Sequence, residues 1–326
     1  MLPAVSAALP GRATDTGRLG AGHATRNGRL GASHAASRGT VGTPRRLGDR
    51  TTFLQMTFIT VNHIELYYEL SGDGNVPLVL VHGSWGDHTN WNPVVRELAR
   101  SFRVLTYDRR GHSQSARSTT QGSLREDATD LAALLDALDL GPAHVVGNSG
   151  GAAVALWLAA ERPEMLRSLA AHEPPLFMLL ADDPASADAL RAIDERMTNV
   201  LRLLRGGHFR NAARHFVDNV AFGPGAWDKL PPAKQDTLVN NAPTFLDELQ
   251  DPNIAIVDLE ALGRFERPTL LSRGERSPAF FPAVVGRIAA AMPAAETMVF
   301  AGAGHTPHVT HPAEFVEAIS GFVRRS

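Results

Sequence analysis

The stretch V145VGNSGGAA153 places one serine among glycines, where a β-branched run ends and an alanine-rich run begins. Valines favour a strand, and the alanines that follow favour a helix. The chain must therefore turn sharply at Ser149, with Gly147 and Gly151 two residues away on either side. Glycines in such a turn indicate strained backbone, or a packing so close that a β-carbon would clash.

The sequence from Gly147 to Gly151 matches the G-x-S-x-G pattern of a nucleophile elbow. In that turn the strain lifts a serine hydroxyl clear of the sheet, and the following helix N-terminus favours developing negative charge. The alternative is a glycine-rich turn that only connects two elements, since the bare pattern also arises by chance. The strand–turn–helix context favours Ser149 as a nucleophile.

Apolar strands alternate with helical segments on both sides of this turn. Strands are predicted at 58–61, 64–70, 77–83, 102–108, 144–148, 166–173, 268–274 and 297–302, and helices near 90–100, 123–138, 150–161, 279–291 and 312–323. The first two strands form a hairpin, and the continuous apolar run at 77–83 indicates a strand buried on both faces. This alternation predicts an α/β fold with a parallel sheet and right-handed crossovers.

The alternation lapses over residues 175–262, a segment rich in alanine, arginine and leucine that is typical of helices. We therefore expect one α/β core, made of residues 56–174 and 263–326, interrupted by a helical cap over 175–262.

The amino-acid composition excludes several kinds of site and ligand. The 326 residues are 44% hydrophobic and 20% charged, which suits a globular body, and the lack of cysteine excludes disulfides, thiolate metal sites and a cysteine nucleophile. Residues 56–326 hold 24 Lys and Arg against 32 Asp and Glu, so no affinity for nucleic acid or an anionic membrane is expected. No apolar run approaches the roughly 18 residues of a membrane span.

Residues 1–55 are expected to be a disordered extension, because glycine, alanine, arginine, serine and threonine dominate them without apolar periodicity. They lack the pattern of a secretory signal, and a cytoplasmic location is expected. A transit peptide and upstream sequence translated from a wrong start stay open as alternatives, since Met56 is itself a plausible start.

A nucleophilic serine also needs hydrogen-bond donors for the oxyanion. The stretch H82GSWGD87 follows the buried strand, so the backbone N–H groups of Ser84 and Gly150 are predicted to converge on a substrate carbonyl oxygen. Trp85, beside them, is a candidate for substrate binding. We expect His82 to be structural.

Taken together, L78VLVHG83, Y107DRRGHSQS115, the elbow and G302AGHTPHVTHP312 resemble the α/β-hydrolase superfamily over essentially all of 56–326. The resemblance implies an eight-stranded, mostly parallel sheet with a helical cap, and His305 as general base. A metal site made of His305, His308 and His311 is a rival interpretation, but no carboxylate stands close by in this loop. His311 precedes a proline at a helix start, which favours capping or packing.

The acid departs from the common pattern of this superfamily. Where many members carry an aspartate after the strand at 268–274, this chain has Ser277, and Glu275 lies two residues early. Glu173, at the end of the preceding strand, occupies the point from which some relatives, including haloalkane dehalogenases, supply the acid. We favour Glu173 over Glu275, with the role of orienting His305 and stabilising its imidazolium.

A narrower resemblance connects the chain to the fungal zearalenone lactonases, through H172EPP175, F280F281, the pattern over 305–312 and the segments at 223–230 and 258–262. It implies an ester or lactone as the small-molecule substrate, with Trp227 and Phe245 as cap residues that face it. Packing inside the cap is the alternative for both aromatic residues.

The predicted reaction is acyl transfer in two steps through Ser149, with no cofactor. A C–C bond hydrolase or perhydrolase that uses the same triad, and a non-catalytic ligand-binding relative, are the alternatives. The oligomeric state stays open, a homodimer included.

Overall fold

The structure, a computed structural model, describes residues 55–119, 122–254 and 256–326. The extension expected at 1–55 thus lies outside the described residues, apart from Gln55. That residue begins the first described strand, one residue before the predicted start of the core.

Eight strands form one sheet, in the order β1-β2-β4-β3-β5-β6-β7-β8. Their bounds are β1 Gln55–Val61, β2 Ile64–Ser71, β3 Pro77–Val81, β4 Arg103–Tyr107, β5 Ala143–Asn148, β6 Leu166–His172, β7 Thr269–Gly274 and β8 Ala295–Phe300. Strand β2 pairs antiparallel with β1 and β4, and every pair from β4 to β8 is parallel. The predicted eight-stranded, mostly parallel sheet is confirmed.

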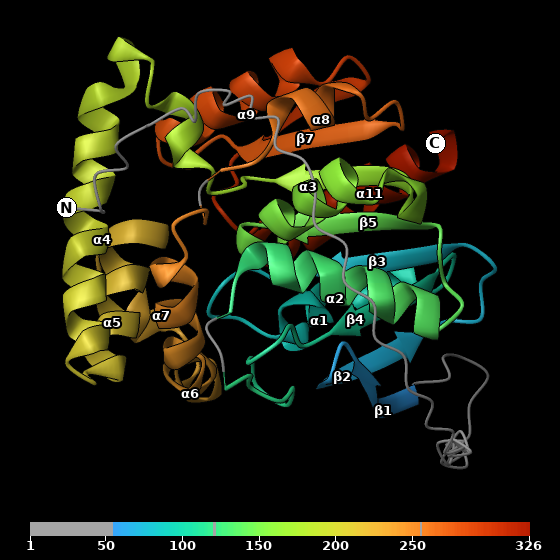
Figure 1. Ribbon diagram of the computed structural model, residues 1–326, viewed down its shortest axis with the longest axis horizontal. Coiled ribbons are helices and arrows are strands. Elements are labelled where there is room, and N and C mark those ends of the chain that lie inside the picture. Colours follow the sequence, from blue (N-terminus) through green and yellow to red (C-terminus); the bar gives the residue numbers. More distant parts are fainter. Residues whose placement is uncertain (1–54, 120–121, 255) are drawn as a thin grey trace, which may run out of the picture. The chain divides into compact units, whose positions relative to one another are not determined.

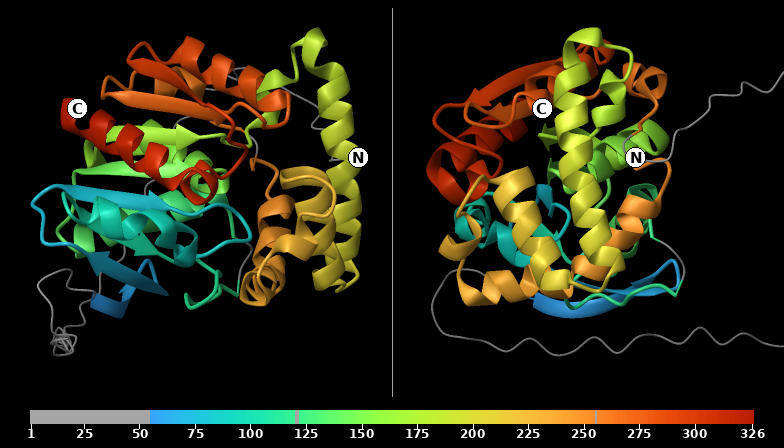
Figure 2. Two further views of the ribbon diagram at one scale, coloured as in Figure 1. Left: turned by 180° about the vertical axis from the view of Figure 1, so that it is seen from behind. Right: turned by 90° about the vertical axis from the view of Figure 1, so that its left-hand side faces the viewer.

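Helices cover both faces of this sheet (Figures 1 and 2). One face carries α2 (Leu124–Ala137), α3 (Gly150–Glu161), α8 (Leu259–Gly263) and α9 (Phe280–Ala291), and the other carries α1 (Asn92–Leu98), α10 (Pro307–Thr310) and α11 (Pro312–Arg325). Alternate side chains of β3 therefore enter different cores: Val79 and Val81 pack on the α2–α3 side, and Leu78 and Leu80 on the α1–α11 side. This explains why the strand is apolar at every position.

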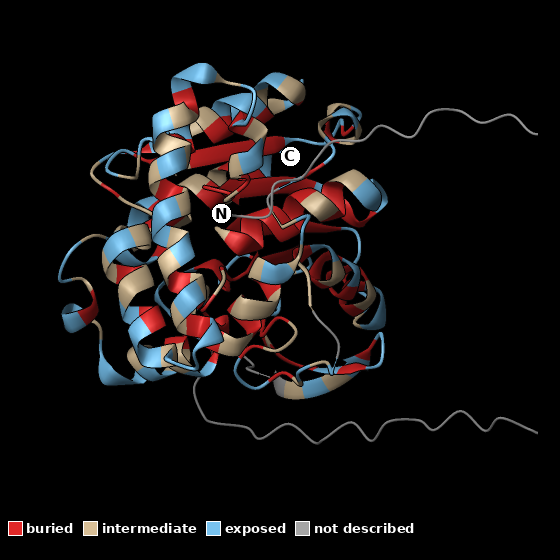
Figure 3. Ribbon diagram, turned by 60° about the vertical axis from the view of Figure 1, so that its left-hand side comes forward, coloured by how far each residue is buried: buried red, intermediate tan, exposed pale blue. Residues whose placement is uncertain are grey.

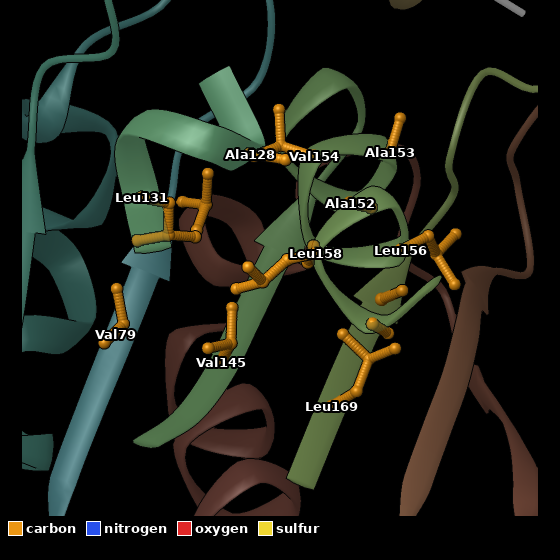
Figure 4. Packing of buried hydrophobic residues seen from close by; sticks show 14 of the residues in the cluster. Val79, Ala128, Leu131, Val145, Ala152, Ala153, Val154, Leu156, Leu158 and Leu169 are labelled. Carbon is orange, nitrogen blue, oxygen red and sulfur yellow. The ribbon is translucent and has the colours of Figure 1, made fainter. Parts of the chain in front are cut away.

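Helix α3, which follows Ser149, is buried along most of its length because it lies between the sheet and α2 and α8. Figure 4 shows Val79, Val145 and Leu169 of three neighbouring strands on the side of the sheet that carries α2 and α3. Alanine and leucine in this helix allow its close approach to β5 and β6. The packing holds the start of α3, and with it the turn at Ser149, in one place.

The chain between β6 and β7 forms a cap, whose buried apolar side chains pack in one hydrophobic cluster together with Trp85 of the core. Its helices are α4 (Ala187–Arg205), α5 (Phe209–Phe216), α6 (Pro232–Asn240) and α7 (Ala242–Gln250), with a π-helical turn at Val217–Ala221. Figure 3 shows their outer sides exposed and the strands of the sheet buried. Helix α8, within the range expected for the cap, instead packs on α3 and α9, and its Leu262 belongs to the core.

Candidate active site

The predicted site residues come from loops at the carboxyl edge of the parallel strands. Ser84 follows β3, Ser149 follows β5, Glu173 follows β6 and His305 follows β8. Because parallel strands end at a common edge, residues more than 200 positions apart in sequence meet there.

Ser149 has the strained backbone that the sequence predicts for it. Its φ is 55° and its ψ is −124°, a conformation that side-chain-bearing residues rarely adopt, and its N–H donates to the carbonyl of His172 over 2.9 Å. A β-carbon on Gly147 would lie 2.3 Å from the carbonyl oxygen of Gly151, and one on Gly151 would lie 2.1 Å from that of Val81. The two glycines are therefore required by close backbone packing.

Ser84 and Gly150 lie side by side, as the sequence analysis expects. A β-carbon on Gly150 would lie 3.0 Å from the backbone nitrogen of Ser84. A β-carbon on Gly83 would likewise lie 3.0 Å from the β-carbon of Ser149. Gly150 also begins α3, so its N–H is one of the free amides at a helix N-terminus. The two amides and the serine thus share one corner of the site.

His305 and Glu173 form a hydrogen bond, in which Nδ1 of the imidazole lies 2.6 Å from Oε2 of the carboxylate. Glu173 has no exposed surface, and its other oxygen accepts the Gly274 N–H over 2.7 Å. Asn148, next to Ser149, donates from Nδ2 to the carbonyl of His305 over 2.9 Å and ties the two loops together. These bonds hold His305 at both its imidazole ring and its backbone carbonyl.

Glu173 is ionised in this setting. Burial by itself raises the pKa of the carboxyl, but the hydrogen bond and the charge of His305 outweigh it, with a smaller effect of His172, and the pKa lies below its ordinary value. An anion held there stabilises a positive charge on His305.

The two other positions considered for the acid have different surroundings. Ser277 is close enough to Glu173 to contribute to the lowering of its pKa, although its buried hydroxyl forms no hydrogen bond within the described residues. Glu275 is exposed and accepts the Gly302 N–H over 2.7 Å. Glu275 thus stabilises a turn, whereas Ser277, which stands where many relatives carry the aspartate, lies near the carboxylate of Glu173.

The three histidines after β8 do not converge. His308 is buried with its ring against Trp91 and Phe315, at centroid distances of 4.4 Å and 5.7 Å, and burial lowers its pKa well below the ordinary value. His311 is the N-cap residue of α11, and its carbonyl accepts the Phe315 N–H. No group of three or more potential metal ligands occurs among the described residues.

His82 is held as a neutral ring under the site. The Arg109 N–H donates to its Nε2 over 2.9 Å, and its Nδ1 lies 2.8 Å from the carbonyl of Gly83. Burial, assisted by the charge of Arg109, lowers its pKa well below the ordinary value. These contacts are those of a structural residue.

The aromatic residues that the sequence analysis expects to face the substrate lie inside the packing between cap and core. Trp85, Trp227 and Phe245 are at most 5% exposed and share one hydrophobic cluster, in which Trp85 contacts Phe245 at 4.6 Å between ring centroids. None of the three lines the cleft beside His305. An apolar residue of an amphipathic cap helix looks the same in sequence whether it faces a ligand or a neighbouring helix.

That cleft has a volume of about 810 Å³ and lies between cap and core. Its walls are α4, the segment 218–224, the loop after β7 and the loop that carries His305. Phe281 stacks on the His305 ring at 5.1 Å, and Phe222 meets its edge at 6.3 Å. Neither contact was predicted: F280F281 marked a family resemblance but no partner for Phe281, and no motif includes Phe222.

The cap also holds the loop that carries Ser84. The Asn241 side chain donates to the carbonyls of Trp85 and Gly86 over 3.2 Å and 2.8 Å, and the Ser84 hydroxyl donates to Glu248 over 2.6 Å. These polar cap residues were missed by the sequence analysis, since a lone asparagine or glutamate gives no signal of its partner.

A serine on such a turn, at the carboxyl edge of a mostly parallel sheet and beneath a helical cap, defines the α/β-hydrolase class of proteins. Comparison with known families agrees. The chain belongs to the alpha/beta hydrolase fold family, whose model matches residues 76–312. No helix in the described part of the chain has both the length and the apolar character needed to cross a membrane.

Two curated relatives match over most of the chain. The zearalenone hydrolase of Bionectria ochroleuca is 28% identical over 271 residues, which are 81% of this chain and 95% of that protein. The 3-oxoadipate enol-lactonase 1 of Acinetobacter baylyi is 27% identical over 263 residues, 79% of this chain and 93% of that protein. The predicted resemblance to the zearalenone group is confirmed at this level.

Other curated relatives match over shorter stretches of 103 and 117 residues, which make up only 28% and 43% of their own lengths. Among solved structures, a thermophilic esterase from Thermogutta terrifontis superposes with a TM-score of 0.67 at 24% identity, over 83% of this chain and 98% of that one. A likeness at this identity shows the shared fold.

Proposed function

We propose that this α/β hydrolase cleaves a small-molecule carboxylic ester or lactone through an acyl-enzyme on Ser149, with His305 as general base and Glu173 as its acid. The observation that carries the proposal is the 2.6 Å hydrogen bond between His305 Nδ1 and the buried Glu173, beside a serine held at φ 55°. The names of the two full-length relatives, a zearalenone hydrolase and an enol-lactonase, support the same substrate class.

In the first step, Nε2 of His305 takes the proton of Ser149 while Oγ attacks the carbonyl carbon. Negative charge on the carbonyl oxygen is stabilised by the backbone N–H groups of Ser84 and Gly150. The tetrahedral intermediate then expels the alcohol, which receives the proton from His305. For a lactone the alcohol stays attached to the acyl group.

In the second step, water gives a proton to His305 and attacks the acyl-enzyme. Ser149 leaves with that proton and the carboxylic acid departs, so the net reaction consumes one water molecule. Glu173 accepts a hydrogen bond from Nδ1 throughout, which keeps Nε2 available as the base and stabilises the imidazolium.

A fluorophosphonate probe tests the nucleophile. The native protein and Ser84→Ala should be labelled on Ser149, and Ser149→Ala should stay unlabelled. Undiminished labelling of Ser149→Ala contradicts the proposal. A panel of aryl esters, lactones and 1,3-diketones, assayed together, then separates ester hydrolysis from C–C bond cleavage.

A further inference from the structure

Two arginines line the cleft beside His305, one from the cap and one from the core. Arg196 lies on α4 of the cap, and Arg276 lies in the loop between β7 and α9 of the core. Both residues are exposed, and within the described ranges neither forms an ion pair. A ligand in the cleft thus meets two guanidinium groups that no carboxylate of the described protein neutralises.

Acidic residues precede both arginines in sequence, Asp194 and Glu195 before Arg196 and Glu275 before Arg276, but none pairs with them within the described ranges. The helix neighbours of Arg196, three and four residues away, are Ala192, Ile193, Asn199 and Val200, none of them acidic. Glu275, beside Arg276 in sequence, accepts the Gly302 N–H.

Asp218 is the one carboxylate among the described residues that line the cleft. Its Oδ1 accepts the Trp227 N–H over 2.8 Å, and its Oδ2 lies 3.5 Å from Nε of Arg214. With two arginines and one engaged aspartate, the cleft attracts anions.

The rest of the lining is largely apolar. Ile193, Val220, Phe222 and Phe280 contribute to the walls. Low-dielectric walls focus the field of nearby charges, and the guanidinium fork matches the two oxygens of a carboxylate. The lining therefore suits a molecule with an apolar body and one anionic group.

We propose that the cleft selects esters or lactones that carry a carboxylate, and that Arg196 and Arg276 determine this specificity. The inference rests on the proposed function, because the cleft is lined by His305, the proposed general base. It adds a charge requirement that neither the triad nor the fold implies.

Charge-matched esters test it. 4-Nitrophenyl hydrogen adipate carries the carboxylate on the acyl side, and its methyl ester is the neutral partner. 4-Carboxyphenyl hexanoate and phenyl hexanoate form the same pair with the carboxylate on the leaving side. At least one anionic ester should show a higher kcat/KM than its neutral partner, because its KM is lower. This preference should decrease in 0.5 M NaCl, since salt screens exposed charges.

Arg196→Gln and Arg276→Gln should each lower kcat/KM for the preferred anionic ester roughly threefold to fivefold, the upper part of the range of an exposed ion pair. Neutral esters should change less than twofold. Arg191→Gln is the matched control, since Arg191 lies on the same helix, pairs with Asp188 and does not line the cleft. Equal rates for both pairs of esters, or variants that slow neutral and anionic esters alike, overturn the inference.

Binding separates this inference from the proposed function. Calorimetry with Ser149→Ala measures the affinities for both anionic esters and for their neutral partners without turnover. If the native protein hydrolyses none of the esters, the proposed function fails, and the anion preference still stands or falls on these affinities. Equal affinities within both pairs reject it.

Discussion

The Ser84 hydroxyl donates a hydrogen bond of 2.6 Å to Oε2 of Glu248, which joins the loop after β3 to helix α7 of the cap. Glu248 is 2% exposed, and its other oxygen accepts from Nη2 of the fully buried Arg109 over 2.9 Å. Arg109 pairs in turn with Asp127 on α2. A row of buried polar groups thus connects the cap, the proposed oxyanion loop and the core.

Glu248→Ala should lower the free energy of unfolding by about 3–5 kcal/mol, because it removes one partner of a buried ion pair. Urea denaturation measures this loss. Ser84→Ala is the milder comparison: it removes one hydrogen bond to a charged group, worth about 1.5–3 kcal/mol. It keeps the backbone N–H, so kcat should stay within a few-fold of the parent. A Glu248→Ala protein as stable as the parent contradicts this account.

Glu173→Gln should reduce kcat by orders of magnitude, up to the ~10⁴-fold seen when the acid of a serine triad becomes an amide, because the amide favours the wrong imidazole tautomer. Glu275→Gln should cost only a few-fold, since Glu275 stabilises the turn at Gly302. Steady-state kinetics with an aryl ester measure both, and melting within a few degrees of the parent shows that the fold is kept. An inactive Glu275→Gln beside a near-normal Glu173→Gln would assign the acid to the later loop.

Gly151→Ala should destabilise the protein by at least ~3 kcal/mol, because the new β-carbon would meet the backbone oxygens of Val81 and His82 at 2.1 Å and 2.5 Å. Gly286→Ala is the matched control on α9, where a β-carbon meets nothing within 4 Å. It should stabilise by about 0.5–1 kcal/mol, since alanine loses less conformational entropy in a helix. Chemical denaturation of both variants measures this difference, and a similar effect at the two positions would argue against close packing at the elbow.

The stability of the protein should fall as the pH drops below about 6.5, the ordinary pKa of histidine. Five buried histidines have pKa values lowered by burial: His82, His112, His144, His172 and His308. The unfolded chain binds protons at these residues while the folded chain does not, so the free energy of unfolding decreases with falling pH. His88 and Asp127 act in the opposite direction: Asp108 and Glu69 outweigh burial and raise the pKa of His88, and burial raises the pKa of Asp127 to about 7, but these are two groups against five.

His144 offers a single-residue test of this pH dependence, since burial and the charge of Arg167 lower its pKa to about 4. Between pH 6.5 and 4, His144→Gln should reduce the slope of unfolding free energy against pH by up to about 1.4 kcal/mol per unit, the contribution of one proton. Denaturant titrations at several pH values measure the slope. A slope unchanged by the substitution would show that His144 does not contribute.

Local sequence was sufficient to predict the strands and helices and the nucleophile elbow at Ser149. Strand and helix patterns depend on neighbouring residues, and the glycines around Ser149 report a backbone requirement that acts over five residues. The resemblance to the α/β hydrolases predicted Glu173 after β6 and His305 after β8, and the carboxyl ends of parallel strands lie at one edge of the sheet.

Only the tertiary structure decided the contacts between elements. Trp227 and Phe245 are apolar in either role, and cap packing buried both against neighbouring helices. Glu248 reaches Arg109 across 139 positions, and Arg196 and Arg276 meet one cleft from different parts of the chain. Hydrophobic periodicity specifies which face of an element is buried but not what covers it, so partners that depend on the docking of the cap carry no signal in the sequence.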